Sequence, residues 1–217
     1  MRPSYTVSIS CPPGDLLLGT GATRVPAAGR RAAAFRAEGA CMQQAMTTGF
    51  DAVDLLAALV SARSPNPPGD ERAVSGVIRD ALRLLGLPEP TVIARSAERP
   101  NMLVRIDGAG PRLMLVGHMD TMPPGDLGSW NSDPFELERS EGRLTGLGVA
   151  DMKSGIAAAL LAAARLVRDP AWNGSLDLLF TADEENCSDY GMKWLAGQDM
   201  LAADAAVILE PAGGPDA

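Results

Sequence analysis

The chain has 217 residues, of which 46% are hydrophobic and 21% charged, a balance typical of a soluble globular domain. Its net charge of −8 argues against nucleic acid and anionic membrane as partners, and no apolar run approaches the ~20 residues that a membrane-spanning helix needs. The three cysteines lack CxxC spacing, which argues against a disulfide framework or a thiolate zinc site and favours a reduced, cytoplasmic setting.

Residues 1–45 differ in composition from the rest of the chain. They are rich in Pro, Gly and Ala, carry more arginines than acids and show no apolar periodicity. The apolar run Leu16–Leu18 is shorter than the ~7–15-residue core of a secretory signal. The composition permits a transit peptide, but we expect a disordered leader or a translation start placed too early, with Met42 or Met46 as the true start. The folded part is then expected over residues 46–217.

Apolar periodicity divides that part into alternating helices and strands, which predicts an α/β sandwich. The predicted elements in chain order are a helix over 51–63, a loop over 64–69, a helix over 70–85, strands at about 91–95, 102–107 and 113–116, a loop over 121–147, a helix over 153–167, a strand over 176–181, a helix near 190–197 and a strand over 205–209. Lys153 is expected to be solvated at its helix start.

The only histidine and several acids follow predicted strands. Gly117-His118-Met119-Asp120 ends one strand, Asp183-Glu184-Glu185 follows a second, and Glu210 follows a third. Open α/β sheets gather ligands at the carboxyl ends of their strands. One imidazole among several carboxylates suits a hard or borderline metal cation. A catalytic site for two metals normally takes a second imidazole, and this chain has none.

His118, Asp120 and Asp151 each have two interpretations. Residues i and i+2 of a strand point the same way, so Asp120 can hydrogen-bond the far nitrogen of a ligating His118. The alternative is a surface histidine beside an acid in a turn. Asp151 opens the helix over 153–167, and it is either an ordinary N-cap or a carboxylate that bridges two cations.

The acids after the later strands are equally open. Adjacent Glu184 and Glu185 point in opposite directions, so one can bind metal while the other reaches a water as general base, with its pKa raised by its neighbour. A solvated acidic turn is the alternative. Glu210, followed by Pro211, can bind metal or simply end its strand.

The order and contexts of these motifs resemble the di-zinc amidohydrolase and exopeptidase family, whose members include acetylornithine deacetylase, succinyl-diaminopimelate desuccinylase, aminoacylase and carboxypeptidase G. The resemblance covers about residues 50–217. The segments that carry it are Gly117–Gly125, Trp130, Asp133-Pro134-Phe135, Gly142-Arg143-Leu144, Gly148–Gly155, Asp183-Glu184-Glu185 and Glu210-Pro211.

The resemblance implies a three-layer α/β/α sandwich with a mixed central sheet, like that of zinc exopeptidases. This chain would be the N-terminal half of the catalytic domain, without the lid domain and the C-terminal half. Two divalent metal ions are implied, zinc first, with cobalt or manganese as alternatives. His118 and Glu210 would bind one ion, Glu185 the other, and Asp151 would bridge both.

The implied chemistry is hydrolysis of an amide bond in an N-acyl amino acid or small peptide by a metal-activated water. Glu184 would be the general base, Asp120 would orient His118, and the peptide bond after Asp151 would be cis. The 217 residues alone are expected to be inactive, and the full-length protein to dimerise through the absent lid. The alternative is a non-catalytic metal-binding or interaction module derived from such an enzyme; the presence of Glu184 favours the enzyme.

Overall fold

The computed structural model describes residues 51–198 and 200–211, so the predicted leader or misplaced start in residues 1–45 lies outside the described residues. Five strands form the central sheet in the order β1-β2-β6-β3-β7. They are β1 (Thr91–Ala94), β2 (Pro100–Ile106), β3 (Arg112–His118), β6 (Ser175–Thr181) and β7 (Ala205–Ile208). β3 runs parallel to β6 and β7, whereas β2 runs antiparallel to β6 and β1 antiparallel to β2. The predicted α/β fold with a mixed sheet is confirmed.

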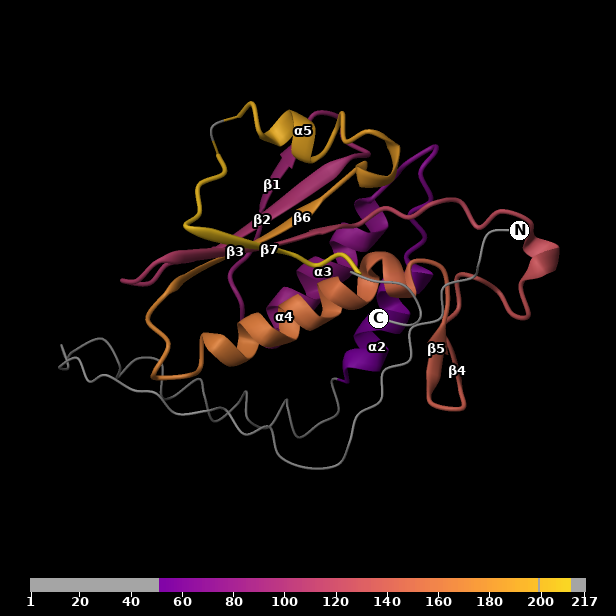
Figure 1. Ribbon diagram of the computed structural model, residues 1–217, viewed down its shortest axis with the longest axis horizontal. Helices are drawn as coiled ribbons and strands as arrows, with labels where there is room; N and C mark the ends of the chain where they lie inside the picture. Colours follow the sequence, from indigo (N-terminus) through magenta and orange to yellow (C-terminus); the bar gives the residue numbers. More distant parts are fainter. Residues whose placement is uncertain (1–50, 199, 212–217) are drawn as a thin grey trace.

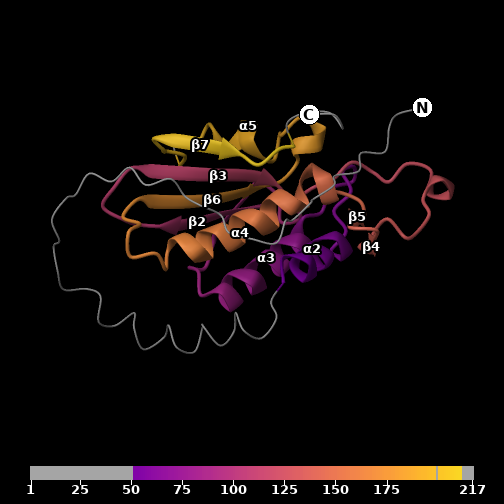
Figure 2. The same cartoon turned by 60° about the horizontal axis from the view of Figure 1, so that its bottom comes forward.

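Helices cover both faces of this sheet (Figures 1 and 2). α2 (Ala52–Ser61), α3 (Arg72–Leu85) and α4 (Ser154–Leu166) lie on one face, and the short α5 (Met192–Leu195) lies on the other. Successive side chains of a strand point to opposite faces, so each central strand contributes to two cores. In β6, Leu178 and Phe180 pack in the cluster with the three helices, while Leu179 packs in the cluster with Leu195 of α5.

The parallel strands end at the same edge of the sheet. β3 lies between β6 and β7, with His118 opposite Thr181 and Val116 opposite Ile208 in register. β7 is the strand at one side of the sheet, next to β3 (Figure 2). Its residues are exposed, Ile208 by 58%. The segments that follow β3, β6 and β7 therefore emerge side by side, and the predicted acids lie in them.

The prediction of a plain loop over 121–147 is wrong in part. β4 (Glu138–Ser140) and β5 (Arg143–Thr145) form an antiparallel hairpin within it, and Leu127–Ser129 forms a turn of 3₁₀ helix. The hairpin turns at Glu141 and Gly142, which both have positive φ, as hairpin turns of this kind require. Both strands have three mostly exposed residues, too few to show an apolar period.

The start of the helix over 153–167 also differs from expectation. α4 begins at Ser154, and Val149–Lys153 before it forms a kinked turn. Asp151 has extended backbone, with φ −119° and ψ 96°, and the N-cap position of α4 is Lys153, so Asp151 does not cap the helix. The peptide bond between Asp151 and Met152 is cis, as the family resemblance implied.

Lys153 is buried, not solvated: only 1% of the residue is exposed. Its Nζ donates a hydrogen bond of 2.8 Å to the carbonyl oxygen of Leu59. Leu59 lies in the last turn of α2, where carbonyls lack a partner within the helix and favour a cation. The prediction failed because the ammonium binds this helix end inside the protein and not water. No helix in the described ranges is long and apolar enough to cross a membrane.

Candidate metal centre

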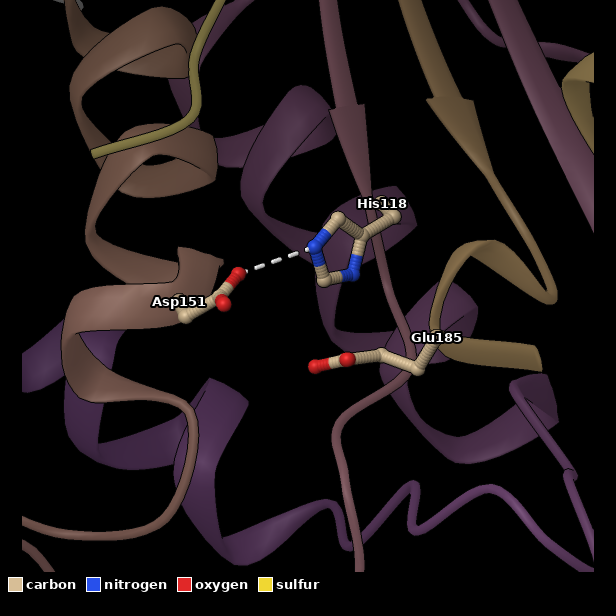
Figure 3. A group of neighbouring side chains, drawn as sticks. All are labelled: His118, Asp151 and Glu185. Atoms are coloured by element: carbon tan, nitrogen blue, oxygen red, sulfur yellow. Dashed lines mark hydrogen bonds and ion pairs between the residues drawn. The ribbon is translucent and has the colours of Figure 1, made fainter. Parts of the chain in front are cut away.

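The sheet edge brings together the single histidine and four acids from separate segments. His118 ends β3, Glu184 and Glu185 follow β6, and Glu210 follows β7. Asp151 reaches the same place from the kinked turn before α4. Figure 3 shows the side chains of His118, Asp151 and Glu185 converging on a common space.

Distances from the imidazole show how close these groups lie. His118 Nε2 is 3.0 Å from an Asp151 oxygen, 3.1 Å from a Glu210 oxygen and 3.8 Å from a Glu184 oxygen. Two sets, His118 with Asp151 and Glu185, and His118 with Glu184 and Glu210, each hold ligand atoms within 4.8 Å of one another. The side chains lie together, as predicted, while the role of each one stays a prediction.

The hydrogen bonds of His118 fix which nitrogen faces the acids. Nδ1 lies 2.9 Å from the carbonyl oxygen of Asp120, which can only accept, so Nδ1 carries a proton. In the neutral ring, Nε2 then presents a lone pair to the carboxylates of Asp151 and Glu210, which is unfavourable. Either a second proton or a metal ion on Nε2 turns this repulsion into attraction.

The pKa values reflect the excess of acids over cations. Burial by itself lowers the pKa of His118, but hydrogen bonds to Asp120 and Asp151 and the charges of Asp120 and Glu210 outweigh it and raise the pKa to about 11. Burial, and next the charge of Asp151, raise the pKa of Glu185 to about 7. The hydrogen bond with His118 lowers the pKa of Asp151. One proton on His118 cannot neutralise four carboxylates, so the site favours an added cation.

Asp120 is fully buried and contacts more than the histidine. Its carboxylate lies 3.5 Å from His118 Nδ1, farther than its own carbonyl oxygen. The two carboxylate oxygens accept hydrogen bonds of 3.1 Å from the backbone N–H groups of Glu184 and Glu185. Asp120 therefore ties the segment after β3 to the segment after β6.

Three buried polar residues behind the acids, Asn66, Glu71 and Arg99, carried no signal in the sequence. Asn66 lies in the predicted loop before α3, and its Nδ2 donates to Asp120 and to Asp183. Arg99, just before β2, donates to Glu71 and to Asp183. Polar residues in a loop, at a helix start or before a strand usually face water, so only the fold places these three inside.

The sequence matches a described family and several curated proteins. The family Peptidase family M20/M25/M40 matches residues 114–216. Succinyl-diaminopimelate desuccinylase of Gluconacetobacter diazotrophicus is 39% identical over 159 residues, which cover 69% of this chain and 40% of that protein. The protein of the same name in Phenylobacterium zucineum is 38% identical over 170 residues, 76% of this chain and 43% of that protein. The chain thus spans about two fifths of the length of these relatives.

Solved structures share the fold at low sequence identity. An M20 family metallo-carboxypeptidase from Sulfolobus solfataricus superposes with a TM-score of 0.65 at 18% identity, over 74% of this chain and 37% of that one. Human carnosine dipeptidase 1 superposes with a TM-score of 0.59 at 21% identity, over 78% of this chain and 40% of that one.

Proposed function

Since the chain belongs to peptidase family M20/M25/M40, we propose that the protein is a metal-dependent hydrolase that cleaves an amide bond of an N-acyl amino acid or small peptide. The observation that carries the proposal is the convergence of His118 Nε2 with the carboxylates of Asp151 and Glu210 at 3.0 and 3.1 Å.

The donor set fits divalent metal ions. Because Nδ1 of His118 carries a proton, Nε2 is the ring nitrogen that can bind a metal ion. The carboxylates around it carry more negative charge than His118 can balance. One nitrogen with several carboxylate oxygens suits zinc, with cobalt or manganese as alternatives. We propose that His118 and Glu210 hold one ion, that Glu185 holds a second and that Asp151 bridges both. Bound there, the ions would polarise the scissile carbonyl and lower the pKa of water.

Glu184 is proposed as the general base. Its side chain is 49% exposed, so a water and a substrate can reach it, and it lies 3.8 Å from His118 Nε2. The carboxylate takes a proton as the water oxygen bonds to the amide carbon. It then gives that proton to the leaving nitrogen as the C–N bond breaks. The bond from its N–H to Asp120 holds its backbone in place.

The proposed substrate class rests on the names of two relatives. Two curated relatives are named succinyl-diaminopimelate desuccinylase, which favours an N-acylated amino acid over a peptide. A cytoplasmic location and a homodimer of the whole protein are part of the proposal, and both rest on the sequence. The alternative function is a non-catalytic metal-binding or interaction module derived from such an enzyme. Glu184 opposes it, since a module without catalysis has no use for a base beside its ligands.

The experiment compares three variants of the full-length protein. Glu184→Gln should abolish hydrolysis of N-acyl amino acids and leave the metal content nearly unchanged, because the amide cannot accept the proton. Glu185→Gln should lower the metal content. Glu138→Gln, on the exposed hairpin strand β4, is the control and should change neither. An active Glu184→Gln variant would remove the general base from the proposal, and a metal-free wild-type protein would remove the proposal altogether.

A further inference from the structure

A network of five buried polar side chains lies behind the metal centre. All are at most 6% exposed, and two of the three acids bind the same side-chain amide from opposite sides. The members are Asn66, Glu71, Arg99, Asp120 and Asp183. Buried charges are costly unless they are paired and hydrogen-bonded, so a network of this size needs an explanation.

Arg99 is the cation of the network. Its Nε donates to Glu71 at 2.9 Å and its Nη2 donates to Asp183 at 3.0 Å, so one guanidinium joins the start of α3 to the segment after β6. Both acids are almost fully buried. The planar guanidinium of arginine makes these two contacts in fixed directions, whereas the ammonium of a lysine is a point charge at the end of a flexible side chain.

Asn66 continues the chain of contacts to the metal centre. Its Nδ2 donates one hydrogen bond to Asp183 at 2.9 Å and one to Asp120 at 2.8 Å, which separates two carboxylates that would otherwise repel. Asp120 then accepts the backbone N–H groups of Glu184 and Glu185. A continuous line of hydrogen bonds thus runs from Arg99 to the backbone of the proposed base and of one proposed metal ligand.

The segment after β6 needs such support because its backbone is unfavourable by itself. Asp183, Cys187 and Ser188 have φ values of 62°, 75° and 56°, a region that residues other than glycine seldom adopt. Conformations of this kind persist only where the surroundings hold them. One contact that stabilises this conformation comes from Asp183, whose second carboxylate oxygen accepts a hydrogen bond of 3.1 Å from the N–H of Tyr190.

Asn101 holds the same segment from the neighbouring strand. Its Oδ1 accepts the N–H of Ala182, and its Nδ2 donates to the carbonyl of Tyr190 at 2.8 Å. Asn101 therefore binds both ends of the acidic segment, at Ala182 and at Tyr190. Arg99, two residues earlier in the same strand region, binds Asp183 next to the first of these ends.

We propose that Arg99 is a positioning residue that, through Asp183, Asn66 and Asp120, aims Glu184 and Glu185 at the metal centre. The inference rests on the proposed function for the roles of these two acids. An ion pair that served only to stabilise the start of α3 would end at Glu71. The second arm of the guanidinium, on Asp183, connects Arg99 to the site.

The guanidinium of Arg99 lies against Gly69, in space that the side chain of a larger residue would occupy. Gly69 has φ +78°, and a Cβ placed on it would lie 2.1 Å from Nη1 of Arg99. Gly69→Ala would therefore displace the guanidinium without removing its charge. It offers a second way to disturb the same contacts.

Zinc affinity of this chain, measured by calorimetry, tests the proposal without any assay of turnover. Arg99→Met should weaken zinc binding ~10–100-fold, the usual effect of removing a partner that orients a ligand. Arg99→Lys should recover only part of the loss, because it restores the charge and not the planar guanidinium. Gly69→Ala should weaken binding in the same direction.

A matched control lies at the other end of the same sheet. Arg112, at the start of β3, pairs with the buried Asp177 of β6 and with Asp107. Its distance from His118 is about 20 Å at the rise of an extended strand. Arg112→Met removes a comparable ion pair and should leave zinc affinity unchanged. An equal loss in this control would show that lowered stability alone weakens binding, which overturns the proposal.

A double-mutant cycle separates positioning from stability. If Arg99 acts through the acidic segment, its loss should cost little more once Glu185→Gln has removed that ligand, so the two effects should not add. Additive losses would overturn the proposal. Wild-type protein that binds no zinc would instead refute the proposed function.

Hydrogen exchange keeps the inference testable if the Arg99 variants fail to fold or the wild type binds no metal. In the unmodified chain, the amides of Glu184 and Glu185 should exchange as slowly as those of β6. Fast exchange at these two amides would contradict a held segment.

Discussion

Replacing Lys153 by Met should change stability with a sign that depends on pH. The ammonium is buried and has the carbonyl of Leu59 in α2 as a hydrogen-bond partner at 2.8 Å. Burial, opposed only by the charge of Asp120, lowers the pKa of Lys153 from 10.5 to about 8. Methionine has a similar length and fills the same space without a charge.

The size of this pKa shift gives the free energy by which the charged lysine destabilises the fold. One pKa unit corresponds to ~1.4 kcal/mol, so the charged lysine destabilises the fold by about 3 kcal/mol. Below pH 8 the native and unfolded chains both hold the proton, and this cost is present in full. Between pH 8 and 10.5 the native chain has released the proton and the unfolded chain has not, so stability rises with pH until the cost is gone.

The variant also loses the hydrogen bond to Leu59, worth about 1–2 kcal/mol. Lys153→Met should therefore be more stable than wild type by about 1–2 kcal/mol at pH 7, and less stable by a similar amount above pH 10.5. Urea unfolding followed by circular dichroism at four pH values measures both limits. Lys193→Met, which removes an exposed lysine, is the control and should show no reversal of sign. A pH-independent difference for Lys153→Met would refute the reasoning.

Two further predictions concern the core and the site. Phe180→Ala should lower the free energy of unfolding by about 3–5 kcal/mol, because Phe180 is 0% exposed in the largest core cluster; a loss under ~1 kcal/mol in urea unfolding would contradict this packing. Zinc affinity should rise close to tenfold per pH unit between pH 7.5 and 8.5, because the metal must displace a proton from His118, whose pKa is about 11; a flat calorimetric profile would show that His118 is not a ligand.

The elements that the sequence predicted well are those with a long apolar period. Helices α2, α3 and α4 and strands β3 and β6 were found within three residues of their predicted ends, because each buries a continuous face. The hairpin of β4 and β5 was missed because exposed strands of three residues show no period. The glycine at position 142 was a turn signal from which the hairpin could have been predicted.

The residues in and around the candidate site also divide into those that the sequence predicted and those that it did not. Strand-end placement was enough to bring His118, Glu184, Glu185 and Glu210 to one edge, since that depends only on parallel strands. The burial of Lys153 and the partners of Arg99 depend on which loop lies beside which strand. Side chains that satisfy buried groups from a distant segment leave no local pattern, so only tertiary structure reveals them.

Nitrogen-15 spectra of the chain labelled at histidine test the metal centre most directly, because one histidine gives one pair of ring signals. Without metal at pH 7.5, both ring nitrogens should carry protons, since the pKa of His118 is about 11. On addition of zinc, Nε2 should lose its proton and shift, while Nδ1 keeps the proton that it donates to the Asp120 carbonyl. Ring signals that zinc leaves unchanged would contradict the assignment of His118 as a metal ligand.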